Sequence, residues 1–295
     1  QANITFDQIT SLKTLMEVFC MTDSKISISN LFLQTMNIDT LFRSYRPFIQ
    51  LYNPTDFEFT VSNVIIQDYQ ASSFVCYSTN LNPNDITAPS PIFNVPSAIK
   101  GIFDYQRFFR FQNITGYGIS LSLLIVVEQF DFEDEIIQAD FKDILLARYS
   151  GSLIASGLST KLNLTNVIVN VIKYKEARDP LVYLFNDEDD MSEVRMVNCI
   201  FASFSYSDQF LVSFTNSKVY MESVIFSRAG QVELIQSQAN ISQFSCINSH
   251  TSVLLGGCLI FNQTEYSLMN SKFVANFAKA GAVYSIGAKR RSKER

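Results

Sequence analysis

Hydrophobic and polar residues alternate along most of the chain, in short runs that break at a regular place. In residues 26–33, Ile26 and Ile28 are apolar, Asn30 follows, and the alternation resumes at Leu31 and Leu33. Strict alternation is typical of a strand that buries one face. The break shifts the apolar phase by one residue, so both halves bury the same side only if the chain bends between them. We therefore expect two short strands joined by a bend at the asparagine.

The same pattern returns throughout the sequence. With the second apolar residue of each run as position 0, apolar residues recur at −2, 0, +3 and +5. Nine copies, 20 to 50 residues apart, have position 0 at Ile28, Val61, Phe111, Phe141, Leu164, Met196, Met221, Ile241 and Leu268. Position +2 is asparagine in six of them, namely Asn30, Asn63, Asn113, Asn166, Asn198 and Asn270, and is Asp143, Ser223 or Gln243 in the others. Self-similarity at such a period indicates a solenoid.

Asparagine suits the bend for two reasons. It tolerates left-handed backbone better than other residues with a side chain, and its amide can bond to the same amide one layer away, as in stacked cross-β assemblies. A third apolar run lies between copies, at 181–185, 210–214, 232–235, 253–260 and 281–284. Three strands per turn predict an all-β fold, a parallel β-helix of about ten coils with an asparagine ladder.

These residues resemble a known group, the pectin-lyase-like right-handed parallel β-helix proteins with an asparagine ladder at a tight turn. Phe273–Asn276 followed by Gly281–Tyr284, with a degenerate copy at Gly256–Leu259, is similar to the FxxN and GGAI repeats of polymorphic outer-membrane proteins and of large protist surface proteins. The ladder covers roughly residues 26–286, and the FxxN and GGAI match covers only the last two coils. The resemblance implies a right-handed coil.

The pattern predicts one domain, residues 1–286, followed by a basic tail at 287–295. The longest gap between copies holds four prolines and predicts an inserted loop at about 72–101. Leu12, Leu15, Met16 and Phe19 share a helical face, so Ser11–Met21 is a candidate cap helix. The last coil is expected to end at Tyr284 without a cap. The chain starts at Gln1, which suggests a processed product or a segment of something larger.

The composition and charge of the chain argue against several classes of partner and binding site. The net charge is −5 and the basic tail has no aromatic residue beside it, so we expect no nucleic-acid partner. The longest apolar run, around 123–127, is far below the roughly 20 residues of a membrane helix. Five cysteines without CxxC spacing favour neither a disulfide framework nor a zinc site, although one or two bridges stay open for a secreted protein. Cys199 and Cys246 fall on inward positions and are expected to be buried and free.

No catalytic signature stands out, and we expect neither a cofactor nor a metal. The acidic run 187–190 with Glu193 has oxygen ligands for Ca²⁺ but lacks an EF-hand spacing, which favours a solvated turn. Enzymes of the resembled fold need carboxylates on consecutive coils. Asp140 faces outward at −1, but its expected neighbours are Arg110 and Asn163. His250, the single histidine, is expected to be a surface residue.

Five N-x-S/T sequons raise the question of glycosylation. Asn163 and Asn240 fall at the outward position −1, Asn262 follows a strand, and Asn3 lies near the beginning of the chain. We expect glycans at these four. Asn113 occupies the ladder position and is expected to be hidden and bare.

The sequence thus favours a structural extracellular or cell-surface protein, not an enzyme. A β-helix without caps exposes strand edges, so we expect fibril assembly or adhesion through other β-helix segments or copies end to end, with glycans as further partners. The alternative is a carbohydrate-active enzyme of the same fold, a polysaccharide lyase or glycoside hydrolase. A glycan-binding adhesin, with Tyr69, Tyr77 and Tyr105 stacking on sugars, is a third reading.

Overall fold

The computed structural model describes residues 2–4, 16–19, 24–34, 49–52, 57–68, 70–78, 106–127, 136–171, 180–185, 191–203, 210–228, 231–250 and 256–290. These residues form strands, bends and turns, and the described part holds no helix. Accordingly, none of the described segments forms a helix that is long and apolar enough to cross a membrane. The fold class is therefore all-β.

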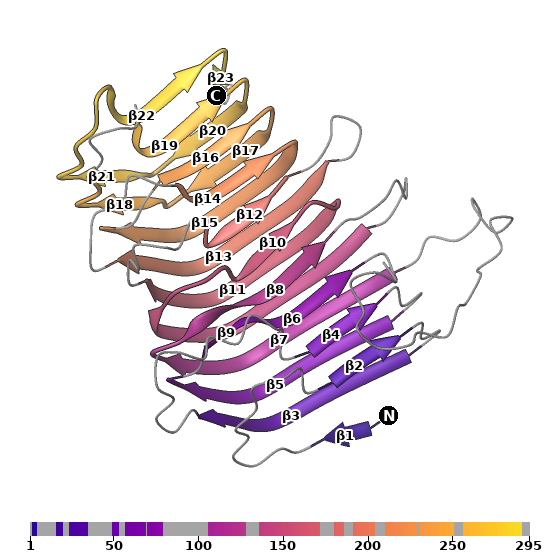
Figure 1. The fold of residues 1–295 in the computed structure, drawn as a ribbon. Coiled ribbons are helices and arrows are strands. Elements are labelled where there is room, and N and C mark those ends of the chain that lie inside the picture. The colour runs from indigo at the N-terminus through magenta and orange to yellow at the C-terminus, as the bar shows by residue number, and fades with distance from the viewer. Residues whose placement is uncertain are drawn as a thin grey trace, which may run out of the picture.

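The strands stack into two open parallel sheets (Figure 1). Successive strands alternate between the two sheets, so that each coil contributes to both. Sheet A follows the order β1 (Ala2–Ile4), β3 (Ser24–Gln34), β5 (Phe57–Gln67), β7 (Gln106–Tyr117), β9 (Ile136–Tyr149), β11 (Thr160–Val171), β13 (Ser192–Ser203), β15 (Ser217–Ser227), β17 (Gln238–Ser242), β20 (Glu265–Met269) and β23 (Lys289–Arg290), with β18 (Ser245–Ile247) and β21 (Lys272–Val274) beside it. Sheet B follows the order β2 (Met16–Phe19), β4 (Ile49–Tyr52), β6 (Gln70–Ser78), β8 (Ser120–Val127), β10 (Ile154–Ser156), β12 (Val182–Leu184), β14 (Phe210–Thr215), β16 (Gln231–Ile235), β19 (Gly256–Asn262) and β22 (Gly281–Ile286).

The predicted repeat register is confirmed. Each of the first eight residues at position 0 pairs with the position 0 of the next copy, from Ile28 with Val61 to Ile241 with Leu268. Ile4 pairs with Ile28, which adds an N-terminal copy that the sequence pattern did not identify. The alternation therefore sets both the buried face and the coil-to-coil pairing.

The bend at position +2 is also confirmed. All nine residues there have a positive φ, between 48° and 58°. A second left-handed corner lies five residues later, at Asp68, Gly118, Arg148, Arg228, Asn248 and Ala275. In the C-terminal coils a third corner precedes sheet A, at Asn216, Gln236 and Gln263. One left-handed residue per corner lets coils as short as 20 residues close without a loop.

The interior is filled by columns of side chains from the apolar positions. Phe111 and Phe141, both at position 0, stack with ring centroids 4.8 Å apart and planes 5° from parallel. Phe201 and Phe226, at position +5, lie 5.0 Å apart. All four side chains are at most 1% exposed. The abundance of phenylalanine therefore supplies a repetitive stacked core.

Several boundaries differ from the sequence prediction. The first two expected strands of each turn form one bent strand as far as β15, and they separate only in β17 and β18 and in β20 and β21. The expected cap helix at 11–21 is wrong where it is described, because β2 pairs with β4 there. The run expected at 253–260 is shifted to β19.

The start of the predicted loop at 72–101 needs correction as well, because residues up to Ser78 belong to β6, and its later part lies outside the described residues. The last coil continues past Tyr284 to Ile286. Lys289 and Arg290 of the expected tail then form β23, paired with Glu265 and Tyr266, because the third corner recurs at Gly287, with φ 58°.

Candidate functional site

The predicted ladder residues lie on the outside of the bend and bond from coil to coil. The Asn63 amide donates to Asn30 Oδ1 at 3.3 Å, and Asn113 donates to Asn63 Oδ1 at 2.8 Å. Asn166 donates to Asp143 Oδ1 at 2.9 Å, and Asn198 donates to Asn166 Oδ1 at 3.5 Å. Asn270 occupies the same corner with φ 48°. The side chain of Asn113 is exposed, so its expected concealment is wrong.

A second ladder, made of buried hydroxyl groups, was missed by sequence reasoning. Position −4 holds a hydroxyl residue in five consecutive coils, each at most 3% exposed, namely Thr160, Ser192, Ser217, Ser237 and Thr264. The Thr160 backbone N–H donates to Ser192 Oγ at 2.8 Å, and the Ser217 N–H donates to Ser237 Oγ at 3.1 Å. Small hydroxyl side chains thus satisfy buried amides at the third corner. Their recurrence at one position was the available signal.

Polar side chains from successive coils line up on the outer face of the first leg of sheet A, defined as positions −3 to +1. The Arg110 guanidinium lies 2.8 Å from Glu58 Oε1 and 3.7 Å from Asp140 Oδ2. Lys25 contacts the other oxygen of Glu58 at 3.0 Å. Asn163 donates to Asp140 Oδ1 at 2.7 Å. The expected neighbours of Asp140, Arg110 and Asn163, are confirmed by the register.

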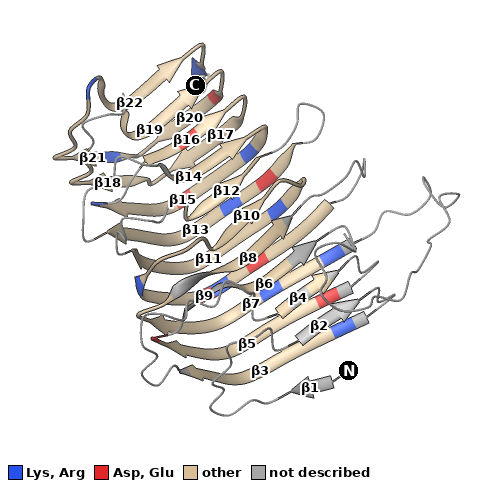
Figure 2. Cartoon of the chain, in the orientation of Figure 1, with Lys and Arg blue, Asp and Glu red and all other residues tan. Residues whose placement is uncertain are grey.

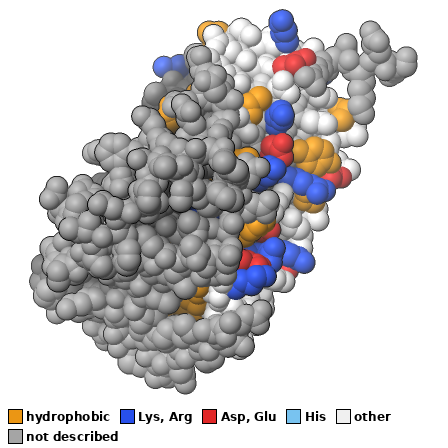
Figure 3. Space-filling model, turned by 90° about the vertical axis from the view of Figure 1, so that its right-hand side faces the viewer, with side chains coloured by type: hydrophobic (Ala, Val, Ile, Leu, Met, Phe, Trp, Pro, Cys, Tyr) orange, Lys and Arg blue, Asp and Glu red, His pale blue; other side chains and the backbone are white. Residues whose placement is uncertain are grey.

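Figure 3 shows this column as a band of acidic and basic side chains along the molecule. In Figure 2, the charged residues of the long strands gather on the right-hand part, which is this leg. Opposite charges on neighbouring coils stabilise the register only modestly, because solvent-exposed ion pairs are worth about 0–1 kcal/mol each. The column nevertheless presents alternating charge to any ligand on this face.

Farther along the same column, one aromatic ring lies between planar polar groups. The Arg195 guanidinium carbon lies 5.7 Å from the centroid of the Tyr220 ring. The Tyr220 hydroxyl donates to Glu222 Oε2 at 2.8 Å, and this bond raises the pKa of Tyr220. Asn240 is the register neighbour of Tyr220 in the next coil. The Arg195 and Tyr220 side chains thus form a cation–π contact on the outer face.

The predicted glycosylation sites differ in exposure. Asn240 is exposed in the middle of β17, Asn163 and Asn262 are half-buried, and Asn3 lies in β1, where only the backbone is described. The amide nitrogen of Asn163 bonds to Asp140. Asn240 is therefore the most exposed of the expected glycosylation sites whose side chains are described, and all four assignments stay predictions.

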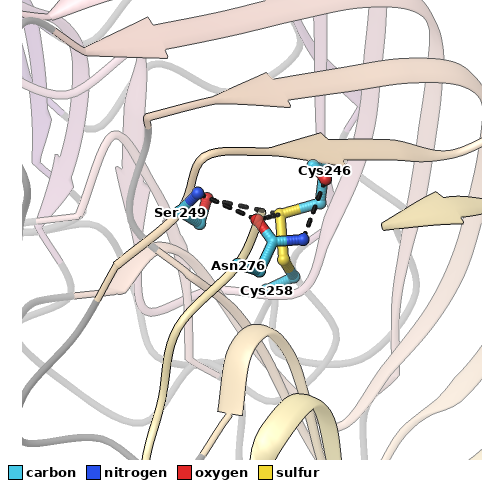
Figure 4. The surroundings of a disulfide bond; sticks show 4 residues. All are labelled: Cys246, Ser249, Cys258 and Asn276. Atoms are coloured by element: carbon cyan, nitrogen blue, oxygen red, sulfur yellow. Dashed lines mark hydrogen bonds between the residues drawn. A yellow bond between two sulfur atoms is a disulfide. The ribbon is translucent and has the colours of Figure 1, made fainter. Parts of the chain in front are cut away.

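One disulfide crosses the interior (Figure 4). Cys246 in β18 and Cys258 in β19 are bonded, and both are at most 1% exposed. Asn276 supports this corner, because its amide donates to the Cys246 carbonyl at 2.9 Å and its Oδ1 accepts the Ser249 N–H at 2.8 Å. The expectation that Cys246 is free is wrong, because its inward position faces an inward cysteine of sheet B. The expectation for Cys199 is confirmed, since it is buried and free.

The remaining candidates are dispersed. His250 is exposed and stacks on Phe277, with ring centroids 4.8 Å apart. Within the described segments, no group of three or more acidic, histidine or cysteine side chains is arranged to hold a metal. The acidic run 187–190 lies outside the described residues, as do Tyr69 and Tyr105, while Tyr77 has only its backbone described, in β6.

The described strands end at the C-terminal side with β22 and β23 (Figure 1), and core residues are less buried there than in earlier coils. β22 is the last strand of sheet B, and β23 is the last strand of sheet A. Leu268 at position 0 is only partly buried, whereas Ile241 one coil earlier is 0% exposed. Phe273 and Val283 in the last coil are likewise only partly buried. Partly buried apolar side chains and the edges of β22 and β23 thus form an apolar end surface at the last of the described strands.

Comparison with models of known protein families, with curated proteins and with solved structures finds no match for this chain.

Proposed function

We propose that this is a structural extracellular or cell-surface protein that acts in fibril assembly or adhesion through its coil end. The observation that carries the proposal is the apolar C-terminal end surface with the edge of β22 beside it. β22 has the sequence GAVYSI and carries no charge, whereas the neighbouring edge strand β23 consists of Lys289 and Arg290. Uncharged edges accept additional strands and charged edges oppose them, so sheet B is the side on which assembly proceeds.

The proposal includes the finer architecture, a right-handed parallel β-helix of the pectin-lyase-like type. Two observations support it. Crossovers between parallel strands of one sheet are right-handed in about 98% of cases, and every coil here makes such a crossover. The asparagine hydrogen bonds at position +2 supply the ladder of that type. N-linked glycans at Asn3, Asn163, Asn240 and Asn262 complete the proposal, and glycopeptide mass spectrometry tests them, with Asn113 expected to be bare.

Negative-stain electron microscopy at modest ionic strength tests the assembly. Long fibres of uniform width are expected from the native protein. Val283→Lys places a charge on the inward face of β22 at the open end and is expected to abolish the fibres. Tyr284→Lys, on the outward face of the same strand, is the matched control and is expected to keep them. Single short rods from the native protein at every concentration would refute assembly.

A carbohydrate-active enzyme is the second candidate, and one observation favours it. Two carboxylates from different coils, Glu58 and Asp140, converge on Arg110 on the outer face. Glycoside hydrolysis uses paired carboxylates, and a guanidinium beside them can bind the carboxylate of an acidic sugar. The test is release of reducing ends or unsaturated products from acidic polysaccharides with Ca²⁺. Activity that Arg110→Ala removes would favour the enzyme, and no turnover would exclude it.

A further inference from the structure

An uncharged aliphatic surface runs along the second leg of sheet A. The outward position +4 holds an apolar residue in most coils, and the register aligns these residues from strand to strand. We define the aliphatic stripe as the +4 residues of six consecutive coils, Ile65, Thr115, Leu145, Ile168, Ile200 and Ile225. Ile65 and Leu145 are each 46% exposed, and Ile168 is 41% exposed.

The stripe is wider than one column. Beside it, the next outward position, +6, holds apolar Tyr117, Ala147 and Ala202 and polar Gln67, Asn170 and Ser227. Tyr117 is 47% exposed, and the Arg148 guanidinium carbon lies 5.3 Å from the centroid of its ring. Among the described residues at +4 and +6, charge first appears at Lys272 in the last coil. Figure 2 shows few charged residues on the left-hand part of the long strands. Scattered exposed leucines are ordinary, but an aligned array marks an interaction surface.

The geometry of the stripe suits packing of one sheet on another. Six strands about 4.8 Å apart and four residues of about 3.3 Å give a surface of roughly 30 by 13 Å. Two such surfaces bury roughly 800 Å², which is below the about 1,200–2,000 Å² of stable interfaces and within the range of weak, transient ones, so a weak dimer that forms only at high protein concentration is expected. The sheet is built of parallel strands in one register, and its outward side chains form even ridges, which suits aligned face-to-face packing.

We propose that the aliphatic stripe is a lateral self-association surface, covered by the stripe of a second copy of this chain. The surface that covers the stripe must be uncharged over the same length. The stripe of a second copy meets that requirement, whereas the first leg of sheet A presents Lys25, Glu58 and Arg110. A two-fold axis makes the contact self-complementary. It passes between Leu145 and Ile168, so that position 65 of one copy faces position 225 of the other. The inference goes beyond end-on assembly, because it uses the side of the coil.

Sedimentation velocity over a concentration series tests the proposal. The native protein is expected to show a reversible dimer, and Ile168→Lys is expected to weaken it by at least about tenfold, because a lysine enters the interface twice. Val197→Lys, outward on the first leg of the neighbouring strand, is the matched control and should dimerise normally. Unchanged circular dichroism and thermal midpoint establish that both variants fold. A monomer at all concentrations, or equal weakening by both substitutions, would overturn the proposal.

Engineered cysteines test the orientation. In a Cys20→Ser, Cys76→Ser background, Ile65→Cys and Ile225→Cys proteins are expected to cross-link when mixed and not when alone. Cross-linking of either protein with itself would overturn the two-fold arrangement. Binding to vesicles of neutral lipid tests whether the stripe contacts a membrane instead of a second copy. A native protein that stays monomeric and binds these vesicles would refute self-association.

This inference and the proposed function fail separately. Fibres of unchanged width from Ile168→Lys, with no lateral dimer from the native protein, would leave assembly standing and refute the stripe. Lateral dimers from a native protein that forms no fibres would support the stripe and refute fibril assembly.

Discussion

The disulfide between Cys246 and Cys258 is expected to be the largest single contribution to the stability of the C-terminal coils. It closes a loop with a sequence separation of 12 residues. Cross-linking a loop of that size lowers the conformational entropy of the unfolded chain by an amount worth about 3 kcal/mol at 25 °C. Replacing both cysteines by alanine also removes two buried sulfur atoms, at roughly 1 kcal/mol each. The double variant should therefore lose about 4–5 kcal/mol of unfolding free energy.

Urea unfolding followed by circular dichroism measures this loss, with Cys199→Ala as the matched control. Cys199 is 0% exposed, as is Cys246, but it is free, so its replacement removes packing alone, about 1 kcal/mol. Reductant should move both the native protein and Cys199→Ala, which keeps the disulfide, toward lower stability, and should leave the double variant unchanged. Because solenoid coils interact mainly with their neighbours, hydrogen exchange should rise first in β18, β21 and β22. A double variant as stable as Cys199→Ala would refute the reasoning.

Three further predictions concern single side chains. Asn63→Gly removes the ladder bonds but keeps the left-handed bend, and it is expected to lower the free energy of unfolding by about 1 kcal/mol. Asn63→Ala adds roughly 1–2 kcal/mol of backbone strain to that loss. Equal losses for the two variants in urea unfolding would contradict the strain. Burial raises the pKa of the Cys199 thiol from 9.0 to about 11 and raises the pKa of Tyr149. The unfolded chain then loses these protons first, so the free energy of unfolding should fall as pH rises from about 9 to 11, and less steeply in Cys199→Ala; parallel curves would contradict this. Burial raises the pKa of Glu233 although Ser213 donates to it at 3.4 Å, so Glu233→Gln should raise the urea midpoint at pH 7 and not at pH 3, and a lower midpoint at pH 7 would contradict it.

Much of the fold follows from the sequence because its repeat is local. Alternation decides which face is buried, and asparagine at +2 marks a left-handed bend, so the pairing of Ile28, Val61 and Phe111 could be predicted without coordinates. The corners occupied by Arg148, Arg228 or Gln236 could not, because arginine and glutamine have little preference for left-handed backbone, and stacking on the neighbouring coil holds them there.

The candidate surfaces depend more on tertiary structure. The sequence determined which residues face outward, including Asp140, Asn163 and Asn240. Only the stacked coils decided that Glu58 and Asp140 meet on Arg110, that Cys246 reaches Cys258 across the interior, and that the aliphatic residues align into one stripe. The physical reason is the sequence separation over which each kind of interaction acts. Alternation and bends act within a few residues, whereas contacts between coils join residues 20 to 50 positions apart, whose spacing depends on the length of each turn.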